Sequence, residues 1–183
     1  MAPNRDRRPQ RRGKPRRGPE KKPSQPRITL RPLSQPGQFE LAYPACVERR
    51  QEDLEEVQVM LAAGEIDLAI DELRWLLEGC RPLLQAHRLL GEIALSDGDL
   101  PLARAHFGYA YELGMAALPP TFSGTLPYAS PGNQPLFESG KGLLWCLKQM
   151  GEAETAQHVL DRLLALDPTD PLGFRGLFDS PKV

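Results

Sequence analysis

The sequence lacks any long hydrophobic segment. No apolar run approaches the roughly 18 to 20 residues that a membrane-spanning helix needs, and the basic N-terminus is not followed by the apolar stretch of a secretory signal peptide. We therefore expect a protein that makes no contact with membranes and resides in the cytoplasm.

Cysteine is scarce, with three residues in a chain of 183. Cys46, Cys80 and Cys146 are far apart, and no pair has the CxxC spacing. An odd number at such distances argues against a disulfide framework and against a zinc site. We predict that all three are small buried apolar residues.

Catalytic motifs are also missing. The three histidines, His87, His106 and His158, lie on different predicted helices, and none belongs to an HExxH pattern. They are typical of surface or partly buried helix positions, while a metal site built between repeats remains the alternative. Cys146 and His158 have no third partner that would complete a nucleophile and its base. We expect no enzymatic activity, no cofactor and no metal.

A phosphate-binding loop is absent as well. Gly140-Lys141-Gly142 is followed by Leu143, so the pattern GxxxxGK[ST] is not met. These glycines instead predict the start of a helix that packs closely against its neighbour.

What is present begins with a strong charge asymmetry. The net charge of the chain is −1, but residues 1–31 contain twelve Lys or Arg and only two acidic residues. Residues 1–27 also hold six prolines and no aromatic residue, so this segment cannot bury enough apolar area to offset its ordering entropy. We predict a disordered basic tail over residues 1–27 and an extended linker over residues 28–44 that packs on an acidic body. The tail contains Arg7, Arg8, Arg11, Arg12, Arg16 and Arg17.

From residue 45 the hydrophobic period becomes helical, and the chain repeats itself. Three segments share a glycine, an acidic residue directly after it, and an alanine four positions after the acid. They are Gly64-Glu65 with Ala69, Gly98-Asp99 with Ala103, and Gly151-Glu152 with Ala156. The first two are 34 residues apart and the third follows 53 residues later, which is one period plus a 19-residue insertion.

Each position in this pattern has a physical reason. The glycine ends one helix where the chain needs a left-handed residue. The acidic residue then lies near the N-terminus of the next helix, where the helix dipole favours negative charge. The alanine lets two helices approach closely, and a large apolar residue four positions on fills the groove between them.

The pattern resembles the tetratricopeptide repeat (TPR), whose period is 34 residues. The second repeat matches through Leu90-Gly91, Ala94, Gly98, Ala103, Phe107 and Ala110, and the third through Leu147, Gly151, Ala156, Leu160 and Pro168. The first departs from it, since Val57 replaces the small glycine. The similarity covers residues 50–170, and the chain resembles small bacterial TPR proteins with a basic tail. It implies an all-α, right-handed superhelical stack of about three helix-turn-helix repeats with a C-terminal cap helix.

We predict helices over residues 45–62, 66–79, 83–96, 100–116, 136–149 and 153–166, with a short cap near 170–178, all within a domain spanning 45–183. The insertion, residues 116–135, is rich in Pro, Gly and Ser and forms a long loop. Loops of this length are usually functional or disordered. We expect it to leave the second repeat and to fold toward the concave face.

The TPR resemblance also implies a function, which is to hold a peptide or protein segment in the concave groove formed by the first helix of each repeat. The partner-binding residues carried over are Arg88, Glu92, Lys141, Trp145 and Lys148. Trp145 is either an aromatic anchor for the partner or a core residue that packs against the inserted loop.

The basic tail favours a second hypothesis, an RNA- or ribosome-associated accessory protein, because Arg and Lys neutralise phosphates. No aromatic residues interleave these cations, so the tail does not predict base stacking. The oligomeric state and the partner are not indicated by the sequence.

Overall fold

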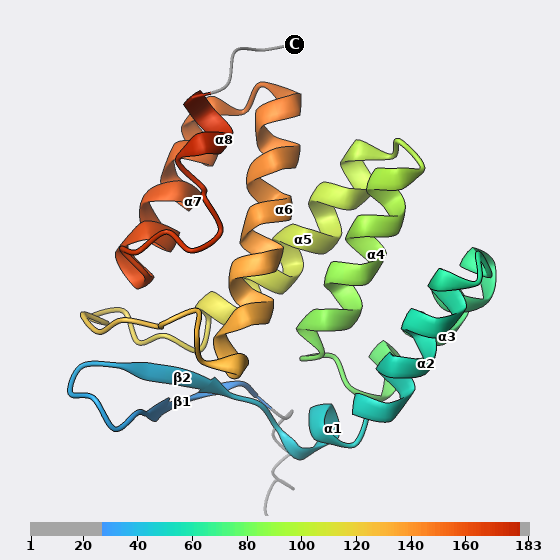
Figure 1. Cartoon of the computed structure of the whole chain (residues 1–183), viewed down its shortest axis with the longest axis horizontal. Helices are drawn as coiled ribbons and strands as arrows, with labels where there is room; N and C mark the ends of the chain where they lie inside the picture. The colour runs from blue at the N-terminus through green and yellow to red at the C-terminus, as the bar shows by residue number, and fades with distance from the viewer. Residues whose placement is uncertain (1–26, 180–183) are drawn as a thin grey trace, which may run out of the picture.

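The computed structural model describes residues 27–179, and these residues are mostly helical (Figure 1). Residues 1–26 of the predicted tail lie outside this range, and with them the six arginines named above. Three helical hairpins follow one another along the chain. They are α2 (Gln51–Ala62) with α3 (Ile66–Gly79), α4 (Leu84–Ser96) with α5 (Leu100–Met115), and α6 (Gln134–Met150) with α7 (Ala153–Leu166). Within the described residues no helix is both long and apolar enough to cross a bilayer.

The recurring glycines lie at the bends of these hairpins, as the sequence predicts. Gly64, Gly98 and Gly151 have φ angles of 79°, 77° and 75°, the left-handed region that side chains disfavour. In each bend the amide of the acidic residue that follows the glycine donates to a carbonyl, over 2.8 to 3.0 Å. The residue that carries this carbonyl lies four positions before the glycine. This hydrogen bond satisfies a carbonyl at the helix end and reverses the chain in the same way three times.

The small residues of the repeat allow close helix packing. The three pattern alanines, at positions 69, 103 and 156, are fully buried. The Phe107 ring lies between Gly91 and Gly142, where an added Cβ would come within 2.9 and 2.5 Å of it. Gly140 and Gly142 therefore serve packing, as expected, but they lie well inside α6 and not at its start.

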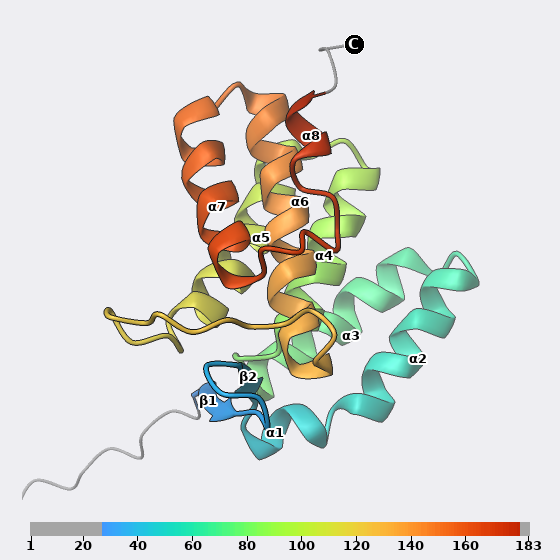
Figure 2. The ribbon, with the colours of Figure 1, turned by 60° about the vertical axis from the view of Figure 1, so that its left-hand side comes forward.

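A short antiparallel ribbon precedes the helices. The linker predicted as extended forms β1 (Thr29–Pro32) and β2 (Phe39–Ala42), which pair with each other. The inserted loop joins this ribbon, because Thr125 exchanges backbone hydrogen bonds with Gly37 and Phe39 at 2.9 Å. At its other side the Leu126 amide donates to the Leu166 carbonyl, 2.8 Å away, at the end of α7. Figures 1 and 2 show the yellow loop running between the blue ribbon and the end of α7.

Asn133 fixes the end of the loop to the ribbon. This residue lies in the short 3-10 helix η1 (Pro131–Asn133) that leads into α6, and it is fully buried. Its Oδ1 accepts from the Leu41 amide at 2.9 Å, and its Nδ2 donates to the carbonyls of Phe39 and Pro127. One side chain thus satisfies the backbones of the strand and the loop at the same point.

The C-terminal cap is shorter than predicted. Helix α8 covers only Gly176–Asp179, because Pro171 and the left-handed Gly173 interrupt the segment before it. The capping role is nevertheless confirmed. Phe174 is fully buried, its ring lies 6.3 Å from that of Phe137, and Leu172 and Leu177 pack against the same core.

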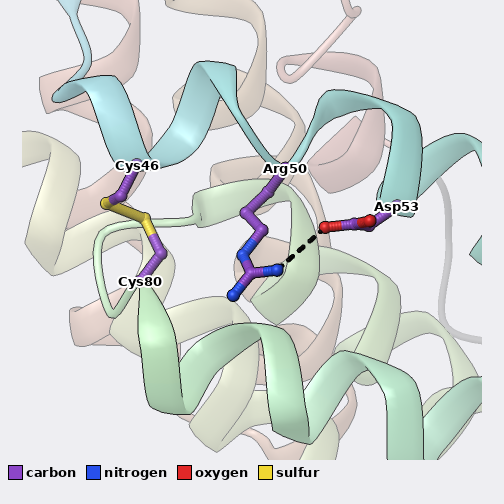
Figure 3. Close-up of a disulfide and its surroundings, with 4 residues drawn as sticks. All are labelled: Cys46, Arg50, Asp53 and Cys80. Atoms are coloured by element: carbon purple, nitrogen blue, oxygen red, sulfur yellow. Dashed lines mark hydrogen bonds and ion pairs between the residues drawn. A yellow bond between two sulfur atoms is a disulfide. The ribbon is translucent and has the colours of Figure 1, made fainter.

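The prediction for the cysteines is wrong for two of the three. Cys46 in α1 (Ala45–Glu48) and Cys80 at the end of α3 form a disulfide, with their Cα atoms 5.7 Å apart (Figure 3). The two cysteines are 34 residues apart in the sequence, and the prediction took them to be apart in space as well. A hairpin nevertheless returns to where it began, so residues that flank it meet. The predicted helix 45–62 is also divided, since α1 and α2 are separated at Arg49 and Arg50. Cys146 is a free, buried residue, as expected.

The hydrophobic core has two parts. The larger one joins the second and third hairpins with the ribbon, the loop and the cap. The smaller one joins the first hairpin to α4 through residues such as Leu73, Leu89 and Ile93. Figure 1 shows the teal first hairpin set apart from the green second one, whereas α5 and α6 lie side by side. Helix α4 therefore belongs to both cores and carries the first hairpin.

Candidate binding groove

The charged residues predicted to bind a partner are largely engaged within the chain. On α4, Arg88 forms ion pairs with Glu92 and, across to α6, with Glu138 at 3.2 Å. Glu138 also accepts from the Tyr128 hydroxyl of the inserted loop at 3.1 Å. Lys148 donates to the Leu177 carbonyl in the cap. These contacts hold helices, loop and cap together.

Two of the predicted residues remain exposed on α6. Lys141 and Trp145 are one helical turn apart, and Trp145 is 39% exposed. The tryptophan is therefore not a core residue packed under the inserted loop. The Tyr128 hydroxyl of the loop donates to Glu138 on the same helix. The face keeps one aromatic residue and one cation available to a partner.

A concave surface lies elsewhere, between the first and second hairpins. We call it the α3–α5 groove, and it encloses about 700 Å³. Its apolar lining consists of Ile70, Leu77, Leu90, Ile93, Ala94, Leu102, Ala105 and Tyr109. Its polar lining consists of Arg74, Glu78, Arg81, His87, Asp97 and His106.

The repeat register explains why this groove is open. At the first junction Arg74 and His87 line the groove. The equivalent residues at the second junction, 34 and 53 positions further on, are Gly108 and Gly140. Gly140 accepts Leu163 so closely that a Cβ there would come within 2.7 Å of it. The glycines allow the second and third hairpins to pack closely. At the first junction the larger side chains of Arg74 and His87 line the open groove.

Helix α5 presents an apolar stripe to the groove. Leu102, Ala105 and Tyr109 follow one another at spacings of three and four residues, so they lie on one face of the helix. Leu102 is 46% exposed and Tyr109 is 43% exposed, although both are large apolar side chains. Exposed apolar residues that share a concave surface mark an interaction site more often than residues scattered singly.

Two histidines meet in the wall of the groove. His87 on α4 and His106 on α5 have their Nδ1 atoms 3.4 Å apart, and the His87 ring lies 4.6 Å from that of Tyr109. Burial, followed by the neighbouring His106, lowers the pKa of His87 to about 4. Burial, followed by the Arg74 charge, lowers the pKa of His106. Both rings are therefore neutral at pH 7 and extend the uncharged part of the wall.

The histidine pair offers a metal ion only two nitrogen ligands. Among residues 27–179 no group of three or more His, Cys, Asp or Glu side chains is arranged to hold a metal. Structural zinc sites use four protein ligands and catalytic ones use three. The third histidine, His158, is exposed on α7 and takes no part in the groove.

The free thiol is not suited to nucleophilic chemistry. Cys146 is completely buried, and this burial raises its pKa to about 11. The thiolate, which is the reactive form, is therefore scarce at neutral pH.

The residues of α4 that the sequence predicted to bind a partner, Arg88 and Glu92, lie on the side of the helix away from the groove. Arg88 and Asp97 are nine residues apart, which at about 100° per residue places them on opposite sides of the helix. The groove faces the side of Leu90 and Asp97. Two signals in the sequence point to it, namely the apolar stripe on α5 and the exchange of Arg74 and His87 for glycines in the repeat register.

No family model, curated protein or solved structure matches this chain.

Proposed function

We propose that this protein is a TPR-like binding module, an adaptor that holds a segment of a partner protein. The observation that carries the proposal is the α3–α5 groove, an open concave surface between two hairpins with exposed Leu102 and Tyr109 in its wall. The 34-residue register supports the TPR interpretation, because its glycines coincide with the bends of three successive hairpins. The role we propose is non-catalytic.

The shape of the groove favours an amphipathic segment. On α4 the lining runs from His87 to Asp97, ten residues or about 15 Å of helix. An apolar floor bounded by Arg74, Glu78 and Arg81 suits a segment with one apolar side and one polar side, as in the binding of helices to grooves. Lys141 and Trp145 on α6 provide a second, smaller contact surface for the same partner or for another one.

Co-purification from the native host tests which surface acts. The α3–α5 groove is altered by Leu102→Asp with Tyr109→Ala, and the α6 face by Trp145→Ala with Lys141→Glu. All four side chains are exposed or partly exposed, so the variants should fold. We expect the first pair to abolish recovery of the partners that wild type captures. Equal recovery by the groove variant and wild type would refute the role of the groove.

The second candidate function is contact with RNA or the ribosome through the basic tail. The charge asymmetry favours it, because twelve Lys or Arg precede a body of opposite net charge. Deletion of residues 1–26 should then remove RNA binding, and binding by the full chain should weaken steeply as salt rises. RNA affinity that is independent of salt, or unchanged by the deletion, would contradict this function.

We also propose a cytoplasmic location. Disulfides in cytoplasmic proteins are commonly transient and redox-sensing, and the Cys46–Cys80 bond would then be of this kind. Fractionation of the native host, with antibody detection of the chain, tests the location.

A further inference from the structure

The Cys46–Cys80 disulfide encloses the whole first hairpin. The 34-residue separation of the two cysteines contains all of α2 and α3, and the bond closes this segment at the open end of the hairpin. It joins α1 to the end of α3. No other covalent link besides the backbone connects these two elements.

Noncovalent contacts accompany the bond, and Val47 of α1 packs against the small core of the first hairpin. Arg50 pairs with Asp53 at 3.0 Å (Figure 3). The Arg50 guanidinium also lies 4.2 Å from the centre of the Trp75 ring. The Arg50 side chain also passes so close to Gly79 that a Cβ there would come within 2.8 Å of it. The Arg50 ion pair is partly exposed to solvent and contributes little, whereas the disulfide is the covalent connection between α1 and the end of α3.

The end of α3 that the disulfide holds is also a wall of the groove. Leu77 and Glu78 belong to the last turn of α3, and Arg81 directly follows Cys80, and all three line the α3–α5 groove. The first hairpin has its own small core, which it shares with α4, with Cys80 and Leu83 between α3 and α4, and with Cys46 and Val47 of α1. A change at the base of this hairpin therefore reaches the groove without disturbing the larger core.

We infer that the Cys46–Cys80 pair is a redox-controlled latch that positions α3 and thereby sets the affinity of the α3–α5 groove. This inference rests on the proposed binding function of the groove. The oxidised chain holds α3 in place and binds, whereas the reduced chain releases the base of the first hairpin and binds more weakly.

A cellular dithiol reductant is the co-reactant of this step. Cys80 is 1% exposed, while Cys46 is partly exposed, so a thiolate of the reductant attacks the Cys46 sulfur. The Cys46–Cys80 bond breaks, a mixed disulfide forms on Cys46, and Cys80 leaves as a thiolate that takes up a proton. The second thiol of the reductant then attacks the mixed disulfide and releases Cys46 as a thiol. Two electrons pass to the protein pair, and the reductant becomes a disulfide.

Hydrogen exchange on the full chain tests the latch. We expect the amides of α2 and α3 to exchange at least tenfold faster in the dithiothreitol-reduced chain and in Cys46→Ser or Cys80→Ser, because local opening follows local stability. Exchange in α6 and α7 should not change. The matched control is Cys146→Ser, whose exchange in α2 and α3 should still depend on the reductant. Unchanged exchange in α2 and α3, or equal acceleration in every helix, would overturn the latch.

The link to the groove needs a second readout. Anilinonaphthalene sulfonate serves as an apolar probe. Binding at the groove is measured as the probe binding that wild type shows and the Leu102→Asp variant lacks. We expect this part to weaken at least severalfold when wild type is reduced and to be independent of the reductant in Cys46→Ser. Faster exchange in α2 and α3 with unchanged probe affinity would overturn redox control of the groove. If the Leu102→Asp variant binds the probe as wild type does, the binding function of the groove is contradicted. The hydrogen-exchange result would then still show whether the disulfide holds the first hairpin in place.

Discussion

Single glycines determine where each hairpin turns. Replacing a glycine by alanine should therefore lower the free energy of unfolding at a bend and raise it inside a helix. Gly98 has a φ of 77°, so alanine there is strained although it meets no neighbouring atom. We expect Gly98→Ala to lower the free energy of unfolding by about 1–2 kcal/mol. Gly108 lies inside α5, and a Cβ added there would lie 3.7 Å from Leu143 Cδ1, an ordinary van der Waals distance. There alanine should raise stability by about 0.5–1 kcal/mol.

Urea denaturation of the two variants and wild type measures both effects. A Gly98→Ala variant as stable as wild type would show that this bend does not need the left-handed residue. The Gly108→Ala variant controls for the general effect of replacing glycine by alanine.

His87 gives the second prediction at the residue scale, a dependence of stability on pH. Its pKa is about 4 in the folded chain and 6.5 in the reference state, so between these values the unfolded chain binds more protons. Stability should therefore be complete above pH 6.5 and decrease as the pH falls toward 4, by roughly 3 kcal/mol for this residue. His87→Gln should flatten the profile over this window. The exposed His158 is the control, and His158→Gln should leave the profile unchanged.

Thermal melts between pH 4 and pH 8 provide the measurement. A wild-type profile that is flat from pH 6.5 to 4.5, or one that His158→Gln alters as strongly as His87→Gln, would show that His87 is not held neutral by the fold.

At the scale of the element, Asn133 connects the ribbon and the inserted loop to the helices. Its three hydrogen bonds are buried and serve the backbones of Leu41, Phe39 and Pro127. In Asn133→Ala these backbone groups lose their partner, so we expect a loss of about 2–4 kcal/mol. Near-ultraviolet circular dichroism and chemical denaturation report the change. Asn133→Asp keeps the acceptor for the Leu41 amide but loses both donors, and it should not restore wild-type stability.

The disulfide acts on a whole element, the first hairpin. In the chain-entropy account, closing a loop of this length stabilises the folded state by about 3–4 kcal/mol. Reduction should therefore lower the denaturation midpoint of wild type and leave that of Cys46→Ser unchanged. Equal midpoints for oxidised and reduced wild type would show that the bond adds no stability.

The predictability of the elements follows from how local their signals are. The bounds of α3 and α7 equal the predicted 66–79 and 153–166, because the glycine bends and the helical period lie within each segment. The pairing of Cys46 with Cys80 and of β1 with β2 depends on how separate segments meet, which local patterns do not encode. The division of the first predicted helix at Arg49 and Arg50 has no proline or glycine to announce it.

At the scale of the whole molecule, the register predicted the three hairpins but not their unequal spacing. The candidate site follows from that spacing, since the residues at the first junction are large and those at the second are glycines. The TPR resemblance predicted Arg88, Glu92 and Lys148 as partner-binding residues. In the structure their side chains form ion pairs or hydrogen bonds within the protein. The stripe of Leu102 and Tyr109 was visible in the sequence, but its exposure depends on how far the first hairpin stands from the second.

The proposed role of the groove is tested most directly by a photo-crosslinking residue placed at position 109, at position 145, or at the exposed position 158 as a control, in the native host. The account predicts that a partner protein is captured at position 109, that capture is much weaker at position 158, and that Leu102→Asp removes the product at 109. Capture at position 145 alone, with none at position 109, would contradict the α3–α5 groove as the binding surface.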